Sequence, residues 1–245
     1  MNIRNNPIEI QCGHKDIADV AKSLIHSVIF FRTHGKFNYK HEGSYFIGTL
    51  GYEVVVCDHL DFTYLRCTSP ALVNRIDEKV QEFADKFDEF ASLGTVSLEF
   101  YTKRPSRWPF NDAKILWEVW NIKIVIQPSS RTSAKDGHVQ RYANCTAKIE
   151  DVLSQKLLDV IKIVNNNSCS LPPMPTQTHL ETVFDTSCND LQPYLYNISY
   201  RIIDGAPSSH SAGGASAGYA DRNGITAISS PQTKLRKFLL GTLEL

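Results

Sequence analysis

Two aromatic side chains separated by one proline form the most distinctive chemical feature of this chain. The stretch KRPSRWPF contains three basic residues and the aromatic pair: Lys103, Arg104, Arg107, Trp108, Pro109 and Phe110. Large aromatic rings supply apolar contact area and are enriched where proteins bind one another. The neighbouring cations suit an anionic surface, either a membrane or a nucleic-acid strand. The pattern therefore predicts recognition rather than bond making, and it leaves the kind of partner open.

The same rings have a second possible use, which is packing against the protein itself. Pro109 restricts Trp108 to extended backbone, so the two rings lie on either side of a stiff residue. Burying both would be worth roughly 3–6 kcal/mol, and exposure to water forgoes that gain unless a partner covers the rings. The residues alone leave two alternatives, a pair packed on the protein's own sheet and an exposed hook.

Residues that could hold a metal or catalyse a reaction match no common pattern. Four of them lie close in sequence: Cys57, Asp58, His59 and Cys67. Their spacing fits no usual zinc site, and alternate strand residues point to opposite faces. The stretch 48–51 (GTLG) lacks the lysine and Ser/Thr of a phosphate-binding loop, so we expect a turn. HExxH does not occur, and we expect no GxSxG nucleophile elbow. We predict no enzyme, no cofactor and no metal, and keep an enzyme as the last alternative.

The totals describe an ordinary globular protein. The chain has 245 residues, of which 42% are hydrophobic, and we expect one domain spanning 1–245. Its 26 basic and 26 acidic residues cancel, so it lacks the positive field of a nucleic-acid-binding protein. The six cysteines are scattered without a CxxC pair, as expected for reduced thiols. With no signal peptide and no apolar run of ~18 residues, we expect a cytoplasmic protein.

Three segments have apolar residues at the spacing of amphipathic helices. We expect the first from about Lys15 to Thr33, where His26 would pack or form a hydrogen bond inside the protein. The second is expected to begin at Ser69, a suitable N-cap, and to end just before Gly94. The third is expected from about Lys148 to Asn165. Each has one apolar face, which predicts packing against a sheet.

Alternating apolar and polar residues predict strands around 60–64, 96–101, 115–126 and 194–202. Residues 96–101 and 115–126 flank the aromatic stretch, so we expect a hairpin with Trp108 and Phe110 in its loop. The strands occur in consecutive runs, with helices between the runs. This order favours an α+β fold with an antiparallel or mixed sheet and helices covering one face.

Two polar segments are expected to be flexible connections. Residues 127–139 (QPSSRTSAKDGHV) contain proline and glycine, and residues 205–232 include SSHSAGGASAG. We expect the second to be a low-complexity insertion within the single domain.

Several blocks of sequence resemble the autophagy-related protein 101 family. The central blocks are SLEFY at 97–101, SRWPF at 106–110 and WEVW at 117–120. Others follow in the same order: GKF at 35–37, YK at 39–40, EG at 42–43, DFTY at 61–64, MPTQ at 174–177, VFDT at 183–186 and QPYLY at 192–196. The resemblance covers nearly the whole chain. Related chains pass more directly to the final Leu-rich segment, whereas here residues 205–232 intervene before Lys234–Leu245.

The resemblance implies a HORMA domain, with a mainly antiparallel sheet and three helices on one face. It also implies a subunit of the autophagy-initiating kinase complex without enzymatic activity. Such a subunit pairs with and stabilises the HORMA domain of the scaffold subunit, autophagy-related protein 13. The family's Trp–Phe finger, which corresponds here to Trp108, Pro109 and Phe110, is implicated in recruiting downstream factors to the forming autophagosome. The implied location is the cytoplasm, with recruitment to the phagophore assembly site.

Two other functions remain open from the sequence. One is a HORMA adaptor of another pathway that clasps a peptide beneath its C-terminal segment. The other is a membrane-surface binder, in which the finger and the basic residues Lys103, Arg104 and Arg107 contact anionic lipid. A weak membrane contact is also compatible with the adaptor role.

Overall fold

A computed structural model describes residues 3–41, 43–87, 91–105, 112–126, 138–166 and 171–204 of the chain. Its main sheet has four strands in the order β1 (Arg4–Cys12), β8 (Ala113–Ile126), β7 (Ala91–Arg104) and β10 (Tyr196–Asp204). β1 runs parallel to β8, and the other neighbouring strands are antiparallel. The predicted α+β class with a mainly antiparallel sheet is therefore confirmed.

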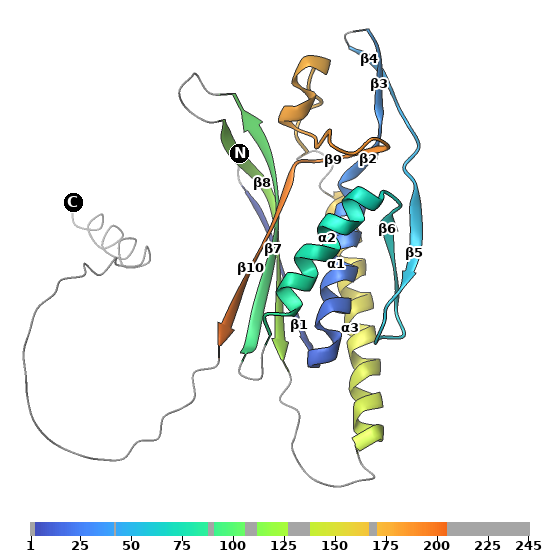
Figure 1. Cartoon of the computed structure of the whole chain (residues 1–245), viewed down its shortest axis with the longest axis vertical. Helices are drawn as coiled ribbons and strands as arrows, with labels where there is room; N and C mark the ends of the chain where they lie inside the picture. Colours follow the sequence, from blue (N-terminus) through green and yellow to red (C-terminus); the bar gives the residue numbers. More distant parts are fainter. Residues whose placement is uncertain are drawn as a thin grey trace, which may run out of the picture. The chain divides into compact units, whose positions relative to one another are not determined.

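Three helices cover one face of this sheet (Figure 1): α1 (Ile17–Phe31), α2 (Pro70–Ala84) and α3 (His138–Asn166). The hairpin formed by β5 (Tyr52–Val56) and β6 (Thr63–Cys67) lies on the other side of the helices, with β6 packed on α1. Helix α1 is therefore enclosed on both sides, which explains why eleven of its fifteen residues are buried. Its composition fits that position, since a helix that is apolar nearly all round must lie in a core.

Short elements complete the described chain. The 3-10 helix η1 (His14–Asp16) precedes α1, and η3 (Gln177–Thr182) follows α3. β2 (Thr33–Gly35) pairs with β9 (Leu191–Pro193), and β3 (Phe37–His41) pairs with β4 (Ser44–Ile47). Residues 48–51 connect β4 to β5 without forming a turn, so the turn predicted for the GTLG stretch is wrong, although the stretch does lie between strands. The largest fully enclosed side chains of the core are Trp120, Phe83 and Phe100.

The second predicted helix is too long by about two turns. α2 ends at Ala84 with Asp85 as its C-cap, and the chain then turns so that Phe87 packs edge-on against Phe83. Gly94 does not stop a helix but lies within β7, where a Cβ would overlap the Phe87 ring. Phe87 keeps the helical spacing of the phenylalanines although it lies beyond the end of α2, because the turn brings its ring into the same core.

The third predicted helix is too short at its start, and the N-terminal strand was not predicted. α3 begins at His138, about ten residues before the expected position. The segment 138–147 contains neither proline nor glycine, so nothing in it stops a helix from propagating backward from the apolar part. β1 alternates buried and exposed residues, but its polar content and Pro7 concealed the pattern. Residues 127–137 and 205–232, both predicted to be flexible, lie outside the described residues.

In the part of the chain that the structure describes, no helix is long and apolar enough to cross a membrane. Cys12, Cys57, Cys67 and Cys188 are free thiols.

Candidate partner-binding surfaces

The two longest strands of the sheet extend past both of their neighbours at one end. β10 pairs with β7 only as far as Phe100, and β1 pairs with β8 only from Glu118 onward. Beyond that row, residues 101–104 and 113–116 pair with each other. We call these two segments the hairpin extension. Its last pair joins Arg104 to Ala113, so residues 105–112 connect the strands at its far end. The predicted hairpin between residues 96–101 and 115–126 is confirmed.

The hairpin extension carries the basic part of the predicted recognition site. Lys103 is half-buried and Arg104 is exposed, and both belong to β7. Lys103 lies directly opposite Lys114 of β8, whose ammonium is 4.7 Å from the centre of the Tyr101 ring. Lys103 and Lys114 at opposite strand positions concentrate positive charge here, at the cost of their mutual repulsion. The other predicted residues, Arg107, Trp108, Pro109 and Phe110, lie outside the described residues, and their exposure stays a prediction.

A β-bulge marks the base of the hairpin extension. Phe100 pairs with Glu118 whereas Tyr101 pairs with Leu116, which leaves Trp117 as the extra residue of β8. Successive strand residues normally face opposite sides, but a bulge turns two neighbours the same way. Trp117 and Glu118 are accordingly both buried, with exposed fractions of 2% and 0%. Glu118 lies on the inward face by ordinary alternation with Trp120, and the bulge adds Trp117 to that face.

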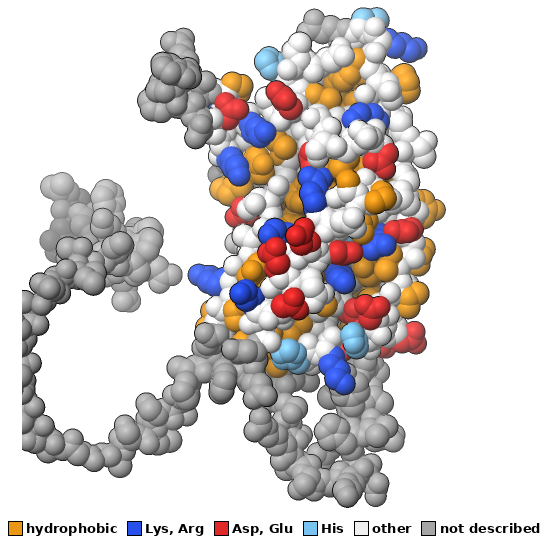
Figure 2. Space-filling view, in the orientation of Figure 1, with side chains coloured by type: hydrophobic (Ala, Val, Ile, Leu, Met, Phe, Trp, Pro, Cys, Tyr) orange, Lys and Arg blue, Asp and Glu red, His pale blue; other side chains and the backbone are white. Residues whose placement is uncertain are grey.

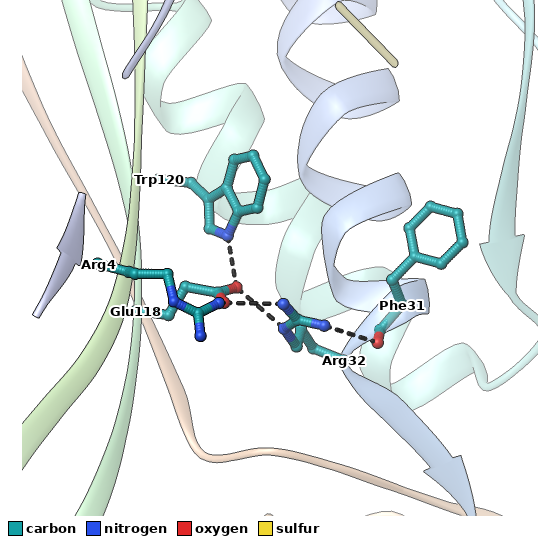
Figure 3. A network of polar contacts seen from close by, with 5 residues as sticks. All are labelled: Arg4, Phe31, Arg32, Glu118 and Trp120. Atoms are coloured by element: carbon teal, nitrogen blue, oxygen red, sulfur yellow. Dashed lines mark hydrogen bonds and ion pairs between the residues drawn. The ribbon is translucent and has the colours of Figure 1, made fainter. Parts of the chain in front are cut away.

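The Glu118 carboxylate is the centre of a buried polar network (Figure 3). Arg32, which directly follows α1, donates from Nε to Oε1 at 2.9 Å and from Nη2 to Oε2 at 2.8 Å. The indole Nε1 of Trp120 donates to Oε1 at 2.7 Å, and Arg4 Nη1 lies 3.4 Å from Oε2. The Arg32 guanidinium also lies over the Trp117 ring, 5.9 Å from its centre.

This network joins the base of the hairpin extension to the end of α1 and to β1. A fork-shaped guanidinium matches both carboxylate oxygens at once, so it fixes orientation as well as distance. The residues involved were not predicted as a group. One signal was present, because Glu118 shares the inward strand face with Trp120 and Ile122, where a lone carboxylate requires a buried partner. Arg32, at the end of a helix, had no comparable signal.

A second surface is apolar. Twelve large hydrophobic side chains are exposed among the described residues, and seven of them lie on three consecutive strands: Tyr45, Phe46, Ile47, Tyr52, Val54, Val56 and Leu65. Figure 2 shows hydrophobic side chains along the right-hand border of the molecule, where Figure 1 places β5. Scattered exposed apolar residues are normal, but seven on three consecutive strands make these strands candidates for an interaction surface.

The buried histidine of α1 has a structural role. His26 is 2% exposed, bonds to Asp77 at 2.9 Å and stacks on Tyr64, which confirms its predicted internal role. Burial opposes ionisation of Asp77, but the His26 hydrogen bond and nearby cations prevail and lower its pKa. Within the described ranges, no group of three or more His, Cys, Asp or Glu residues could hold a metal ion. The four residues considered for zinc do not converge.

Three of the described thiols are poor nucleophiles. Burial, followed by nearby carboxylates, raises the pKa of Cys12 and that of Cys57 to about 12. Burial also raises the pKa of Cys67 to about 11. Because the thiolate is the reactive form, these three side chains are protonated and weakly reactive at neutral pH.

Comparison with known proteins identifies relatives over most of the chain. The family profile of autophagy-related protein 101 matches residues 9–178. The autophagy-related protein 101 of Xenopus tropicalis is 39% identical over 206 residues, which cover 83% of this chain and 91% of the relative. The Homo sapiens protein of the same name is 38% identical over 206 residues, with the same coverage. The Arabidopsis thaliana protein is 23% identical over 181 residues, 68% of this chain and 78% of the relative. These names refer to autophagy and to no enzymatic activity.

Proposed function

Because this chain belongs to the autophagy-related protein 101 family and has a role in autophagy, we propose that it is a non-catalytic adaptor of the autophagy-initiating kinase complex. In this proposal, residues 1–245 form a single HORMA domain that pairs with and stabilises the HORMA domain of autophagy-related protein 13. A finger of Trp108, Pro109 and Phe110 then recruits downstream factors. The protein acts from the cytoplasm and is recruited to the phagophore assembly site.

The observation that carries this proposal is the hairpin extension. Its strands continue beyond β1 and β10, so a partner can approach the connection at its end without meeting the rest of the sheet. Two aromatic rings held there supply the kind of anchor that dominates binding energy in small interfaces. The prolines in that connection reduce the number of conformations that binding must select.

The buried network supports the same function by making the base of the hairpin extension rigid. Glu118 belongs to the last row in which all four strands pair, and Arg32 fixes it to the end of α1. Binding to a preorganised segment costs less conformational entropy than binding to a mobile one. The network therefore serves to present the finger in one orientation.

The double substitution Trp108→Ala and Phe110→Ala tests the proposal. Co-expression with the scaffold's HORMA domain should give unchanged co-purification and thermal stability, while recruitment of downstream factors to the phagophore assembly site is lost. Lys123→Ala, an exposed position of β8 away from the hairpin extension, is the control and should recruit normally. Loss of solubility in the double variant would show that the rings are part of the core. Normal recruitment would show that the finger has no such role.

One observation favours a second candidate, contact with an anionic membrane. Lys103 and Lys114 face each other on the hairpin extension, next to the exposed Arg104. Basic residues beside an aromatic hook can bind lipid headgroups while the rings enter the interface. Such binding would be weak and sensitive to salt, since it depends on few charges.

A further inference from the structure

β5 has an unpaired edge within the part of the chain that the structure describes. Its only partner there is β6, in an antiparallel pair. Two backbone hydrogen bonds at the ends of the pair show which residues of β5 face β6. Cys57 N–H donates to Phe62 C=O, and Thr68 N–H donates to Gly51 C=O. Hydrogen-bonded and non-hydrogen-bonded residues alternate along an antiparallel strand. The N–H and C=O groups of Tyr52, Val54 and Val56 therefore point away from β6.

The same three residues carry exposed apolar side chains. Tyr52, Val54 and Val56 are 62%, 64% and 65% exposed, and Leu65, opposite Val54, is 37% exposed. Unpaired backbone groups and apolar side chains thus occur together along one short strand. Proteins normally protect such an edge with lysine, proline or a covering segment. β5 contains neither lysine nor proline.

The two outer strands of the main sheet differ from β5 in this respect. β10 exposes polar and charged residues, including Asn197, Ser199 and Arg201. β1 contains Pro7 and exposes Glu9. Both strands therefore have the features that discourage pairing with another chain. The contrast indicates that the edge of β5 is left available for a partner.

Charge around β5 favours an uncharged polypeptide over an anionic surface. Glu53 and Arg66 are the charged residues of the two strands, and they pair with each other at 2.6 Å. The apolar face therefore has no excess of cations to attract lipid headgroups. A strand with apolar residues at alternate positions would cover the side chains and satisfy the backbone groups together.

We propose that β5 is a docking edge for an extended segment of the scaffold subunit, uncharged and apolar at alternate positions. The segment adds a strand beside Tyr52, Val54 and Val56 and covers their side chains. This inference rests on the proposed pairing with the scaffold's HORMA domain and names the surface that the pairing uses.

The test uses the full chain with the scaffold's HORMA domain as the probe. Val54→Lys should weaken binding by about 10- to 100-fold, because a buried ammonium replaces an apolar contact. Ile203→Lys is the matched control, since it changes a 47% exposed apolar residue on the edge strand β10, and it should bind normally. A second measurement uses no substitution. Adding the scaffold's HORMA domain to the unaltered chain should slow amide hydrogen exchange of Tyr52, Val54 and Val56 by more than tenfold.

The outcomes separate this inference from the proposed function. If the unaltered chain does not pair with the scaffold, both proposals fall. If it pairs, and Val54→Lys pairs equally tightly with no slowing at β5, only the docking edge is wrong. Slowing that depends on the concentration of the chain alone would overturn the proposal in favour of self-association. Binding to vesicles of anionic lipid that Val54→Lys removes would overturn it in favour of a membrane.

Discussion

Glu118 and Arg32 are 86 residues apart in the sequence, yet they form a two-point ion pair in the interior with N–O distances of 2.8 and 2.9 Å. Both side chains are essentially inaccessible to water. A buried pair of this kind adds little net stability compared with apolar residues of the same shape, but breaking it leaves a charge without a partner. Its role is therefore to specify how the hairpin extension meets the helix.

Replacing only one member of this pair should be strongly destabilising. In Glu118→Gln the Arg32 cation stays buried without its counter-charge, so the free energy of unfolding should fall by about 3–5 kcal/mol. Urea unfolding measures the change. The exposed pair between Glu9 and Lys123, at 3.0 Å on neighbouring strands, provides the control. Glu9→Gln should change stability by less than about 1 kcal/mol.

Replacing both members should restore much of that loss. The double variant Arg32→Met and Glu118→Leu removes both charges, so its free energy of unfolding should be higher than that of Glu118→Gln by about 2 kcal/mol or more. If the pair positions the finger, recruitment should remain impaired in this stable variant. Equal stability of the single and double variants would contradict the ion-pair explanation.

Gly94 should tolerate no side chain, because a Cβ there would overlap the Phe87 ring. Gly94→Ala should lower the free energy of unfolding by about 1–3 kcal/mol through overpacking. Adding Phe87→Leu, which shortens the opposing side chain, should recover part of the loss relative to Phe87→Leu alone. Ser92→Ala, at an exposed position of the same strand, is the control and should change stability by less than about 0.5 kcal/mol. Additive effects of the two core substitutions would argue against direct contact.

Ionisation of Asp16 should lower the free energy of unfolding at neutral pH relative to mild acid. Burial, with a further contribution from Asp19, raises its pKa above the ordinary 3.8, although a hydrogen bond from the Gly13 backbone opposes this. The folded state therefore holds the proton more tightly than the unfolded state. The penalty is absent below the unfolded pKa and develops as pH rises through the folded pKa. Asp16→Asn should raise the free energy of unfolding at pH 7, and the gain should vanish below about pH 4.

Thermal unfolding across this pH range checks the Asp16 prediction. The exposed Asp58→Asn is the control, and its effect should be less than about 0.5 kcal/mol. A stability gain for Asp16→Asn that is the same at pH 3 and pH 7 would show that packing, and not ionisation, is responsible.

Membrane contact through the hairpin extension should depend on its cations. If this second function holds, vesicles with anionic lipid should bind the chain at low salt and release it as salt rises, because exposed charges are screened within about 8 Å at physiological ionic strength. Lys103→Ala with Lys114→Ala should reduce sedimentation with the vesicles. The control substitution Lys162→Ala removes an exposed cation of α3 and should leave binding unchanged. Salt-independent binding would exclude the electrostatic explanation.

The correct and incorrect predictions have a common physical origin. The hairpin around the aromatic stretch and the apolar faces of α1 and α3 follow from periodicity, which a single segment carries by itself. The end of α2 was misplaced because Phe87 continues the helical spacing while packing from a turn. The bulge at Trp117 was not foreseen, since the extra residue exists only relative to the register of the opposite strand.

By itself, the sequence determined the α+β class, the neutral character of the chain and the family to which it belongs. These properties follow from composition, local spacing and blocks of residues that can be read one segment at a time. Only the tertiary structure decided that Arg32 would meet Glu118, that the hairpin would extend past its neighbours and that the apolar edge of β5 would have no partner strand among the described residues. Those features depend on which distant segments pack together and in which register, and packing free energy, not local preference, selects them.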